Sequence, residues 1–573
     1  MRSSTQRRLC MFLAAIIVAT AIPAAGEEDT PKDATPLPII ERPRIWGDSF
    51  VPRSKPPART MATVSLAGLS ADERLALTCL QGLVAREQPG IFLIRHEPED
   101  RFWMDWHVAK GHVERFEPVA EWPTLFAAHR GMLKGAVVPD TKLFRGDLIA
   151  LNVAACEDLI VATPELATRL DLPIVHDLRG RFRTYAEGLE WLWTSYRDRL
   201  NPHLCDFRSP RLLPFATFDH AFQWRGLMFW LAGTKEEDKP GVDRPAEARV
   251  IARILSEMPI NGVCLGFPGM GEGEGPGEPP GVELLSRYGK SLVCTNHCGN
   301  YSFWSGVAID QLDQPQQPPP PPLERDKIYI ALNVSDGDNQ ILWPSFYRRY
   351  FEHPAFGTFP LAFGMGPAIR ELQPAIAQWY YEHATTTTEF FADVSGAGYM
   401  QPDHFGEAYA DRDRVWTTFL DSTSRLMKPL GMRTIRTVEG NDTSLQRYET
   451  ALPFCHSLFA DMGRYSGREG IAKLTYTLPD GMPVFRAVTS WRYGKEGFLR
   501  EIREQVGEQR PAFVNGFVHC WTFAMDDLVK IHADRDPDMI FVTPSQLAAL
   551  YRTPHESASS PATAPGRGIH EQR

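Results

Sequence analysis

The chain has 573 residues, of which 43% are hydrophobic and 23% charged, and it carries a formal net charge of −10. This length exceeds what one hydrophobic core usually organises, so several domains are expected. No long run of Lys or Arg supplies the basic face that nucleic acid or an anionic membrane needs, so neither is an expected partner, and a neutral or small polar substrate fits better.

The N-terminus has the pattern of a secretory signal peptide over residues 1–26. Arg2, Arg7 and Arg8 precede the apolar stretch 9–22, which is too short to span a bilayer comfortably, and small residues follow at 23–26. The pattern predicts a secreted or periplasmic protein, with an uncleaved anchor as the alternative. No other stretch is long and apolar enough to span a membrane, so the mature chain is expected to be soluble.

Eight cysteines remain after residue 26, too few in so large a chain for a disulfide framework. Cys294 and Cys298 lie closest, with His297 between them, and could bind a metal or form a bridge. No second ligand pair follows at the spacing of a zinc site, so no metal is expected, and nothing else indicates a cofactor.

Residues 60–210 alternate predicted helices and strands, which indicates small parallel α/β layers. A helix is expected over 66–86, capped near Ser70 and Asp72, and strands over 90–95, 135–138, 147–153 and 172–176. A further α/β domain is expected over 211–312, with a helix at 246–257 and strands at 262–266 and 291–295. The glycine-rich run 269–277 does not match a dinucleotide-binding fingerprint, and its two glutamates would repel phosphate, so it is expected to be a flexible surface loop.

The Pro-rich segment 313–325 is the clearest domain boundary, because five consecutive prolines favour an extended spacer. The C-terminal domain, 326–552, again alternates strands and helices. Its strands are expected at 327–334, 361–363, 389–394, 434–439, 457–461, 484–490, 512–519 and 539–542, and its helices include 368–383, 414–427 and 497–506. Seven or eight β/α units favour a compact or distorted (β/α) barrel, with an open doubly wound sheet as the alternative. The tail, 553–573, is expected to be disordered.

Two polar segments directly follow strands of this domain, where a β/α architecture places its functional face. The first is Asn333-Val-Ser-Asp336-Gly-Asp338-Asn339-Gln340, in which two carboxylates could serve as acid, base or metal ligand, or could simply form an Asx-turn. The second is Ser395-Gly-Ala-Gly-Tyr399-Met-Gln401-Pro402. Its glycines allow a ligand to approach the backbone, and Tyr399 could stack on a sugar, although such a segment is more often just a turn.

Together these segments resemble the GxGYxYP family of proposed glycoside hydrolases. The namesake motif stands as Gly396, Gly398, Tyr399 and Pro402, with Gln401 in place of the second tyrosine, and the S-D-G-D-N segment stands at 335–339. The likeness extends upstream through the segment 77–86, and so covers most of the chain from about 60 to 550. It implies a multidomain α/β fold more firmly than an activity.

A glycosidase needs two carboxyl groups on either side of one bond, about 5 Å apart for retention and roughly 6.5–9.5 Å apart for inversion. The predicted catalytic carboxylates are Asp336, Asp338, Glu439 and Asp461, with Asp336 and Asp338 as the acidic centre. The predicted substrate-binding residues are Asn333, Asn339, Tyr399, Gln401, Asn441, Trp491, His519 and Trp521. The segments after 334 and 394 are expected to meet at one cleft.

The sequence therefore predicts an exported carbohydrate-active enzyme with paired carboxylates. A non-catalytic carbohydrate-binding or cell-envelope scaffold remains open, because no acid/base pair can be proved from the sequence. A metal-dependent polysaccharide deacetylase is a third possibility, although the C-terminal domain has no H-x-x-x-H, and the lack of G-x-S-x-G argues against a Ser-His-Asp hydrolase.

Overall fold

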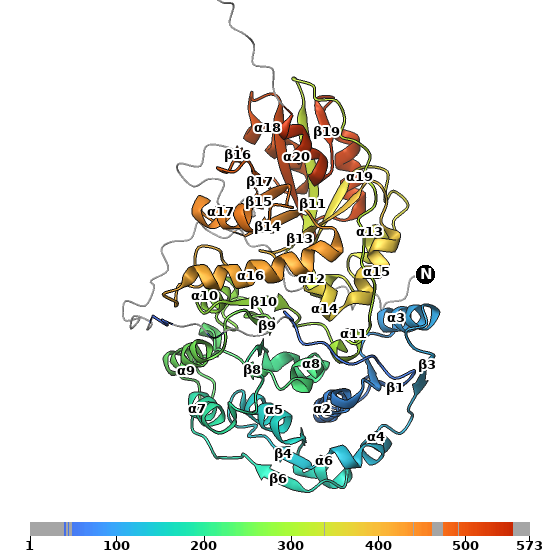
Figure 1. The fold of residues 1–573 in the computed structure, drawn as a ribbon. Helices are drawn as coiled ribbons and strands as arrows, with labels where there is room; N and C mark the ends of the chain where they lie inside the picture. The colour runs from blue at the N-terminus through green and yellow to red at the C-terminus, as the bar shows by residue number, and fades with distance from the viewer. Residues whose placement is uncertain are drawn as a thin grey trace, which may run out of the picture.

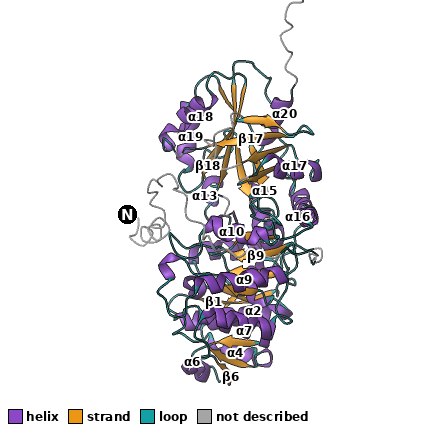
Figure 2. Ribbon diagram, turned by 90° about the vertical axis from the view of Figure 1, so that its left-hand side faces the viewer, coloured by secondary structure: helices purple, strands orange, loops and turns teal. Residues whose placement is uncertain are grey.

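The computed structural model describes residues 39–41, 44, 49–336, 339–438, 440–460, 474–490 and 492–553. The expected signal peptide and nearly all of the expected tail lie outside these residues. The molecule is elongated, with three small parallel sheets stacked below a barrel (Figures 1 and 2). No helix within the described part is long and apolar enough to cross a membrane.

The first domain is built on β1 (Thr60–Ser65), which lies between β2 (Ile91–Ile94) and β3 (Arg115–Pro118), all parallel. The crossover helix α2 (Ala71–Glu87) begins at Ser70, whose side chain accepts from the backbone N–H of Glu73 while the Glu73 carboxylate accepts from that of Ser70. This capping box satisfies two helix donors. Ser70 was one of the two predicted cap residues, although the helix was predicted to begin at 66 and begins at Ala71.

The second domain has β4 (Gly135–Val138) between β5 (Leu159–Val161) and β6 (Ile174–Asp177). The predicted strand 147–153 is wrong, because these residues form part of α5 (Gly146–Glu157). Every residue from Leu148 to Cys156 is buried, since α5 packs among α2, β5, β8 (Leu227–Phe229) and α7 (Tyr185–Tyr196). A helix that is apolar all round has no 3.6-residue stripe, and its sequence cannot be distinguished from a buried strand.

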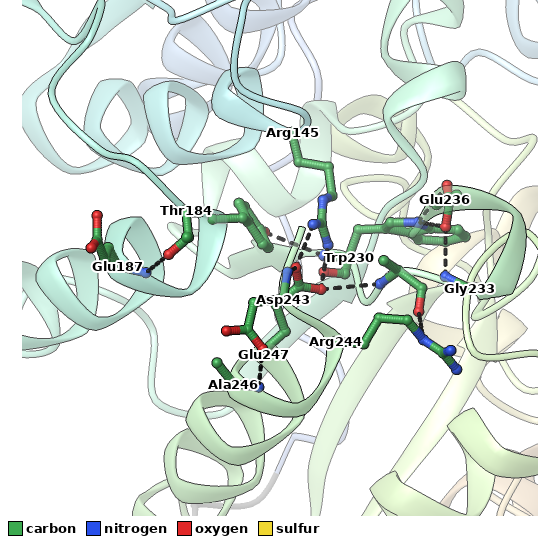
Figure 3. Close-up of polar contacts among 12 residues, drawn as sticks. Arg145, Thr184, Glu187, Trp230, Gly233, Glu236, Asp243, Arg244, Ala246 and Glu247 are labelled. Carbon is green, nitrogen blue, oxygen red and sulfur yellow. Dashed lines mark hydrogen bonds and ion pairs between the residues drawn. The ribbon is translucent and has the colours of Figure 1, made fainter. Parts of the chain in front are cut away.

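The third domain is a four-stranded parallel sheet in the order β10 (Lys290–Cys294), β9 (Gly262–Gly266), β7 (Leu204–Phe207), β8. Its helix α9 (Arg244–Glu257) is tied to the second domain by a buried ion pair (Figure 3). The Glu247 carboxylate accepts from the two terminal nitrogens of Arg145 at 2.6 and 2.7 Å, and both side chains are 0% exposed. The pair fixes the first turn of α9 to the loop before α5.

The glycine-rich run 269–277 is anchored rather than a free loop. The carboxylate of Glu236 accepts from the backbone N–H of Gly275 at 2.9 Å, from that of Gly233 at 2.7 Å and from the indole of Trp230 (Figure 3 shows the last two). A Cβ atom on Gly233 would collide with the carbonyls of Gly273 and Gly275. The run therefore packs against the loop after β8.

The C-terminal domain is a closed seven-stranded parallel barrel, as predicted, and not an open sheet. The strand order is β12 (Leu361–Met365), β13 (Thr388–Ala392), β14 (Thr434–Thr437), β15 (Ser457–Ala460), β17 (Pro483–Val488), β18 (Ala512–His519) and β11 (Ile328–Ser335). The barrel closes where Asn333 and Val334 of β11 pair with Ala362 and Phe363 of β12. Two further strands lie beside it: β16 (Thr475–Thr477) pairs antiparallel with β17, and β19 (Met539–Phe541) pairs with β11.

Helices surround the barrel (Figures 1 and 2): α16 (Arg412–Met427), α17 (Asp442–Ala451), α18 (Phe498–Val506), α19 (Met525–Asp534) and α20 (Pro544–Arg552). The predicted helix 368–383 is two helices, α14 (Ile369–Leu372) and α15 (Pro374–His383). Pro374 has no backbone N–H and suits a first helical position, so a new helix begins there.

The barrel interior changes from apolar to polar along its axis. Aromatic side chains from five strands form one buried cluster, closed at the amino end by Leu547 of α20; they are Tyr329, Phe391, Phe459, Phe485 and Phe513. Because side chains alternate across a strand, the residues two, four and six positions further on also face inward. At the carboxyl end these include Ser335, Asp393 and Phe517, so the polar functional groups collect there.

The Pro-rich segment is extended and docked on the barrel domain. The Gln314 side chain donates to the carbonyl of Phe390 at 2.7 Å and accepts from its N–H at 3.0 Å, and Gln317 donates to the carbonyl of Thr388 at 2.7 Å. The Gln546 side chain donates to the carbonyl of Pro318 at 3.0 Å. The side-chain amides of Gln314 and Gln317 thus bond to backbone groups of β13 in the place where a neighbouring strand would otherwise do so.

Candidate active site at the barrel mouth

Asp336 follows β11 directly and is held by His519, the last residue of β18, and by Trp521 in the loop after it. His519 Nε2 lies 2.8 Å from Asp336 Oδ1, and the indole N–H of Trp521 donates to Oδ2. The register explains the first contact, because Ser335 and His519 are paired residues of adjacent strands. The side chains of Asp336 and His519 are 15% and 18% exposed, so this carboxylate is oriented yet reachable from solvent.

His519 is itself oriented by the same loop, since its Nδ1 lies 3.0 Å from the hydroxyl of Thr522. The partly buried ring of Trp521 packs against Phe346, with 4.6 Å between ring centroids. Aromatic faces beside a carboxylate suit the apolar face of a sugar ring.

A second carboxylate, Asp393, lies buried at the end of β13. Its Oδ1 accepts from Arg436 Nε at 2.6 Å, its Oδ2 accepts from the Ser335 hydroxyl, and both side chains of the Asp393–Arg436 pair are 0% exposed. Gly364 makes room for this arrangement, because a Cβ atom there would overlap the Asp393 carboxylate and lie 2.7 Å from Ser335 Oγ. β11, β12, β13 and β14 therefore each contribute one residue to this unit.

Buried polar groups continue below and beside this unit. Asn333 donates to the side-chain oxygen of Asn515 at 2.6 Å, across the β11–β18 pair. Burial raises the pKa of Tyr347 well above its ordinary value, and the nearby Cys520 thiol and the carboxylates of Asp336 and Asp393 add to this effect. The Tyr347 hydroxyl is buried and has no hydrogen-bond partner among the residues described.

The structure brings together four of the predicted site residues at the mouth: Asp336, Asn333, His519 and Trp521. Asp338, Glu439, Asp461 and Trp491 lie outside the described residues, and Asn339 is described only as the first residue of α12 (Asn339–Leu342). Asn441 caps α17, since its side chain accepts from the backbone N–H of Ser444 at 3.0 Å. That structural task accounts for the Asn441 side-chain oxygen without a substrate.

Tyr399 and Gln401 lie at the interface with the third domain and not beside Asp336. The Tyr399 hydroxyl donates to Glu278 of α10 (Glu278–Arg287) at 3.0 Å, and the Gln401 side chain donates to the carbonyl of Pro279 at 3.0 Å. Each residue is only 6% exposed. The namesake motif is thus an interdomain contact, which corrects the expectation that these two side chains bind substrate.

Asp393, Arg436 and Tyr347 were not predicted as site residues from the sequence. Asp393 was detectable, because it is the last polar residue of the predicted strand 389–394 and polar residues at strand ends mark the functional face. Arg436 lay inside a predicted strand. It is a candidate site residue only because its side chain faces the barrel interior, which the sequence does not show. Tyr347 precedes the short helix α13 (Arg348–Phe351), and no pattern in the sequence distinguishes it from a core tyrosine.

No group of three or more His, Cys, Asp and Glu side chains in the described ranges is arranged to hold a metal ion. All eight described cysteines are buried and unbridged, including Cys294 and Cys298. The described part of the mouth offers a partly exposed carboxylate and imidazole, Asp336 and His519, which suit acid–base chemistry.

A closed parallel barrel with carboxylates at its carboxyl end, preceded by three small α/β domains, defines a multidomain β/α-barrel protein. Family models for the first, second and third GxGYxYP domains match residues 60–121, 133–200 and 204–306, and the model described as "GxGYxYP putative glycoside hydrolase C-terminal domain" matches 326–552. The chain belongs to the GxGYxYP family.

Among solved structures, the fold is similar to a "putative hydrolase" from Bacteroides thetaiotaomicron, with a TM-score of 0.73 and 19% identity over 89% of this chain and 98% of that one. A "putative polysaccharide deacetylase" from Mycobacterium smegmatis gives a TM-score of 0.26, with 10% identity over 41% of this chain and 94% of that one. A peptidoglycan deacetylase from Bdellovibrio bacteriovorus gives 0.23, with 10% identity over 42% and 64%. Scores this low carry no argument about fold or activity. No curated protein matches the sequence.

Proposed function

We propose that this protein is an exported glycoside hydrolase that acts on carbohydrate at the barrel mouth, with Asp336 as a catalytic carboxylate. The observation that carries the proposal is the solvent-accessible Asp336 carboxylate, fixed by His519 and Trp521 at the carboxyl end of β11. Membership of the GxGYxYP family supports the same class of reaction.

Asp336 fits the role of base or nucleophile. The Trp521 indole donates to one of its oxygens and His519 Nε2 lies beside the other, and a carboxylate held in this way is oriented for attack or proton abstraction. The buried Asp393 serves a different purpose: with Arg436 it forms a fixed charged pair under the mouth. A preorganised pair of this kind contributes by electrostatics and positioning rather than by contact with the scissile bond.

The opposing general acid is proposed to be Asp338, Glu439 or Asp461. Asp338 follows a predicted strand of the barrel, and the other two end predicted strands. Retention or inversion depends on which one acts, since the two outcomes require carboxyl separations of about 5 Å and roughly 6.5–9.5 Å. Trp521 and His519 are proposed to contact the sugar, and Asn339 and Trp491 remain proposed substrate ligands.

The test is a glycan and glycoside panel assayed with the full chain and the variants Asp336→Asn, Asp338→Asn, Glu439→Gln and Asp461→Asn. Asp336→Asn is expected to lower kcat by at least about 100-fold while glycan binding and the circular dichroism spectrum persist. Asp198→Asn, at a side chain 97% exposed, is the matched control. Full turnover in Asp336→Asn would remove this residue from the mechanism. Glycan binding without any bond cleavage would favour the scaffold, and acetate release would favour a deacetylase.

A further inference from the structure

Two of the three guanidinium nitrogens of Arg436 have no hydrogen-bond partner among the described residues. Nε donates to Asp393, but the buried Nη1 and Nη2 atoms have no hydrogen-bond partner within the described part of the chain. An unmade hydrogen bond at a buried group is destabilising, and more so when the group is charged. Two such donors on one side chain therefore need an explanation, and a missing ligand is one.

The free edge of Arg436 points into the barrel. The Asp393 carboxylate accepts from Nε, on the long side of the guanidinium. The end edge, formed by the two Nη atoms, has no partner of this kind in the described ranges. The Cζ atom lies 5.0 Å from the ring centroid of Phe517, on β18, and β14 and β18 are separated by two strands in the sheet order. The side chain thus reaches across the interior. Ile435 pairs with Ala392, so Arg436 stands level with Asp393 at the carboxyl end, close to the mouth.

Two parallel N–H donors in one plane match a carboxylate, which accepts them with both oxygens. Two other buried polar atoms without partners among the described residues suit sugar hydroxyls: the side-chain oxygen of Asn333 inside the barrel and the hydroxyl of Tyr347, which precedes α13. Asp393 already balances the charge of Arg436, and Asp336 adds another negative charge nearby. Recognition would therefore depend on the geometry of the fork rather than on a net positive field.

We propose that the substrate is an acidic polysaccharide, and that the end edge of Arg436 binds the carboxylate of one of its uronic acid residues. The proposal rests on the glycoside hydrolase function proposed above and adds the substrate class. It makes Arg436 a specificity-determining residue beside Asp336.

The first experiment compares hydrolysis of a panel of polyuronides with hydrolysis of the same polymers after chemical reduction of their carboxyl groups. The native polymer is expected to show a kcat/KM roughly 10- to 100-fold higher, the range of one charge-assisted bidentate contact. Arg436→Lys keeps a positive charge for Asp393 but lacks the fork, and is expected to lose this preference. Arg447→Lys, whose partner Asp413 is 83% exposed, is the matched control and should keep it.

The second experiment measures binding of oligo-uronates and their carboxyl-reduced forms to Asp336→Asn by calorimetry, so that no turnover is needed. Arg436-dependent binding of the acidic forms supports the carboxylate site even if no glycan is cleaved, in which case only the hydrolase function fails. Cleavage or binding without preference for the acidic form, or binding of neither form, overturns the carboxylate site. If Arg436→Lys does not fold, the double variant Arg436→Met/Asp393→Asn removes both charges of the pair and takes its place.

Discussion

Tyr399 and Leu292 exchange two backbone hydrogen bonds, at 2.7 Å from the Tyr399 N–H and 2.8 Å from the Leu292 N–H. This antiparallel bridge joins the loop after β13 to β10, the outer strand of the third domain. The GxGYxYP motif therefore fixes the position of the barrel relative to the domains before it.

Gly398 is a position in this contact where there is little room for a side chain. A Cβ atom there would lie 2.9 Å from Ser291 Oγ and 3.0 Å from the Leu292 carbonyl oxygen, and a backbone atom cannot move aside cheaply. Gly398→Ala is expected to lower the free energy of unfolding by about 1–3 kcal/mol. Gly131→Ala, where a Cβ atom would meet nothing within 4 Å, should change it by less than about 0.5 kcal/mol. Equal urea midpoints for the two variants would contradict this account.

Gly364→Ala tests the buried unit under the mouth. The new methyl group would overlap the Asp393 carboxylate, so Asp393 is expected to move away from Ser335 and Arg436. Turnover should fall much more than in Gly516→Ala, a neighbouring barrel position where a Cβ atom would come no closer than 3.2 Å to another atom. Initial rates and thermal unfolding of both variants check this, and an unchanged rate in Gly364→Ala would show that Asp393 can shift without consequence.

The buried Lys290 makes stability depend on pH. Burial lowers the pKa of its ammonium group to about 7, whereas the unfolded chain holds a lysine pKa of about 10.4. Between these values the unfolded state binds more protons, so stability is expected to rise as the pH increases from about 7 toward 10. Lys290→Met should remove that contribution and be more stable than the native chain near pH 6. Urea unfolding at several pH values measures it, with the exposed Lys142→Met as control; parallel profiles for all three proteins would refute it.

The docked Pro-rich segment is expected to resist proteases. Gln314 forms two hydrogen bonds with the backbone of Phe390, so Gln314→Ala should release the segment and speed cleavage between residues 308 and 325. Gln316→Ala, at an exposed neighbouring glutamine, is the control. Limited proteolysis followed by mass spectrometry of the fragments would show the difference. Rapid cleavage of the native chain in this segment would mean that the contacts of Gln314 do not hold it.

The sequence predicted the barrel well because its strands are short apolar runs bounded by turn residues. The barrel strand at 512–519 was predicted with the observed bounds, as was the strand at 262–266 in the third domain. It also located Asp336, because a residue that follows the first strand must lie at the carboxyl end. The contact with His519, 183 positions away, depends on the β11–β18 register, which no local pattern encodes.

The role of Tyr399 could not be predicted for a related reason. A glycine-rich turn lets any group approach the backbone, and the sequence does not say whether that group is a ligand or another domain. Asn441 shows the same ambiguity, since an asparagine just before a helix suits both a cap and a binding site. Local chemistry identified which residues were polar and well placed, while the arrangement of the four domains decided what each one contacts.

The continuous core has a consequence for how this architecture can evolve and be engineered. One cluster of buried side chains runs from Phe92 and Leu292 to Trp343 and Val518, and Trp103 of the first domain donates to the carbonyl of Pro344 at 2.6 Å. A barrel excised at residue 326 would expose the apolar surface that these domains cover and leave the loop after β13 without its strand partner. The four domains are therefore expected to be inherited and expressed together. The barrel is not expected to fold when it is transferred alone to another scaffold.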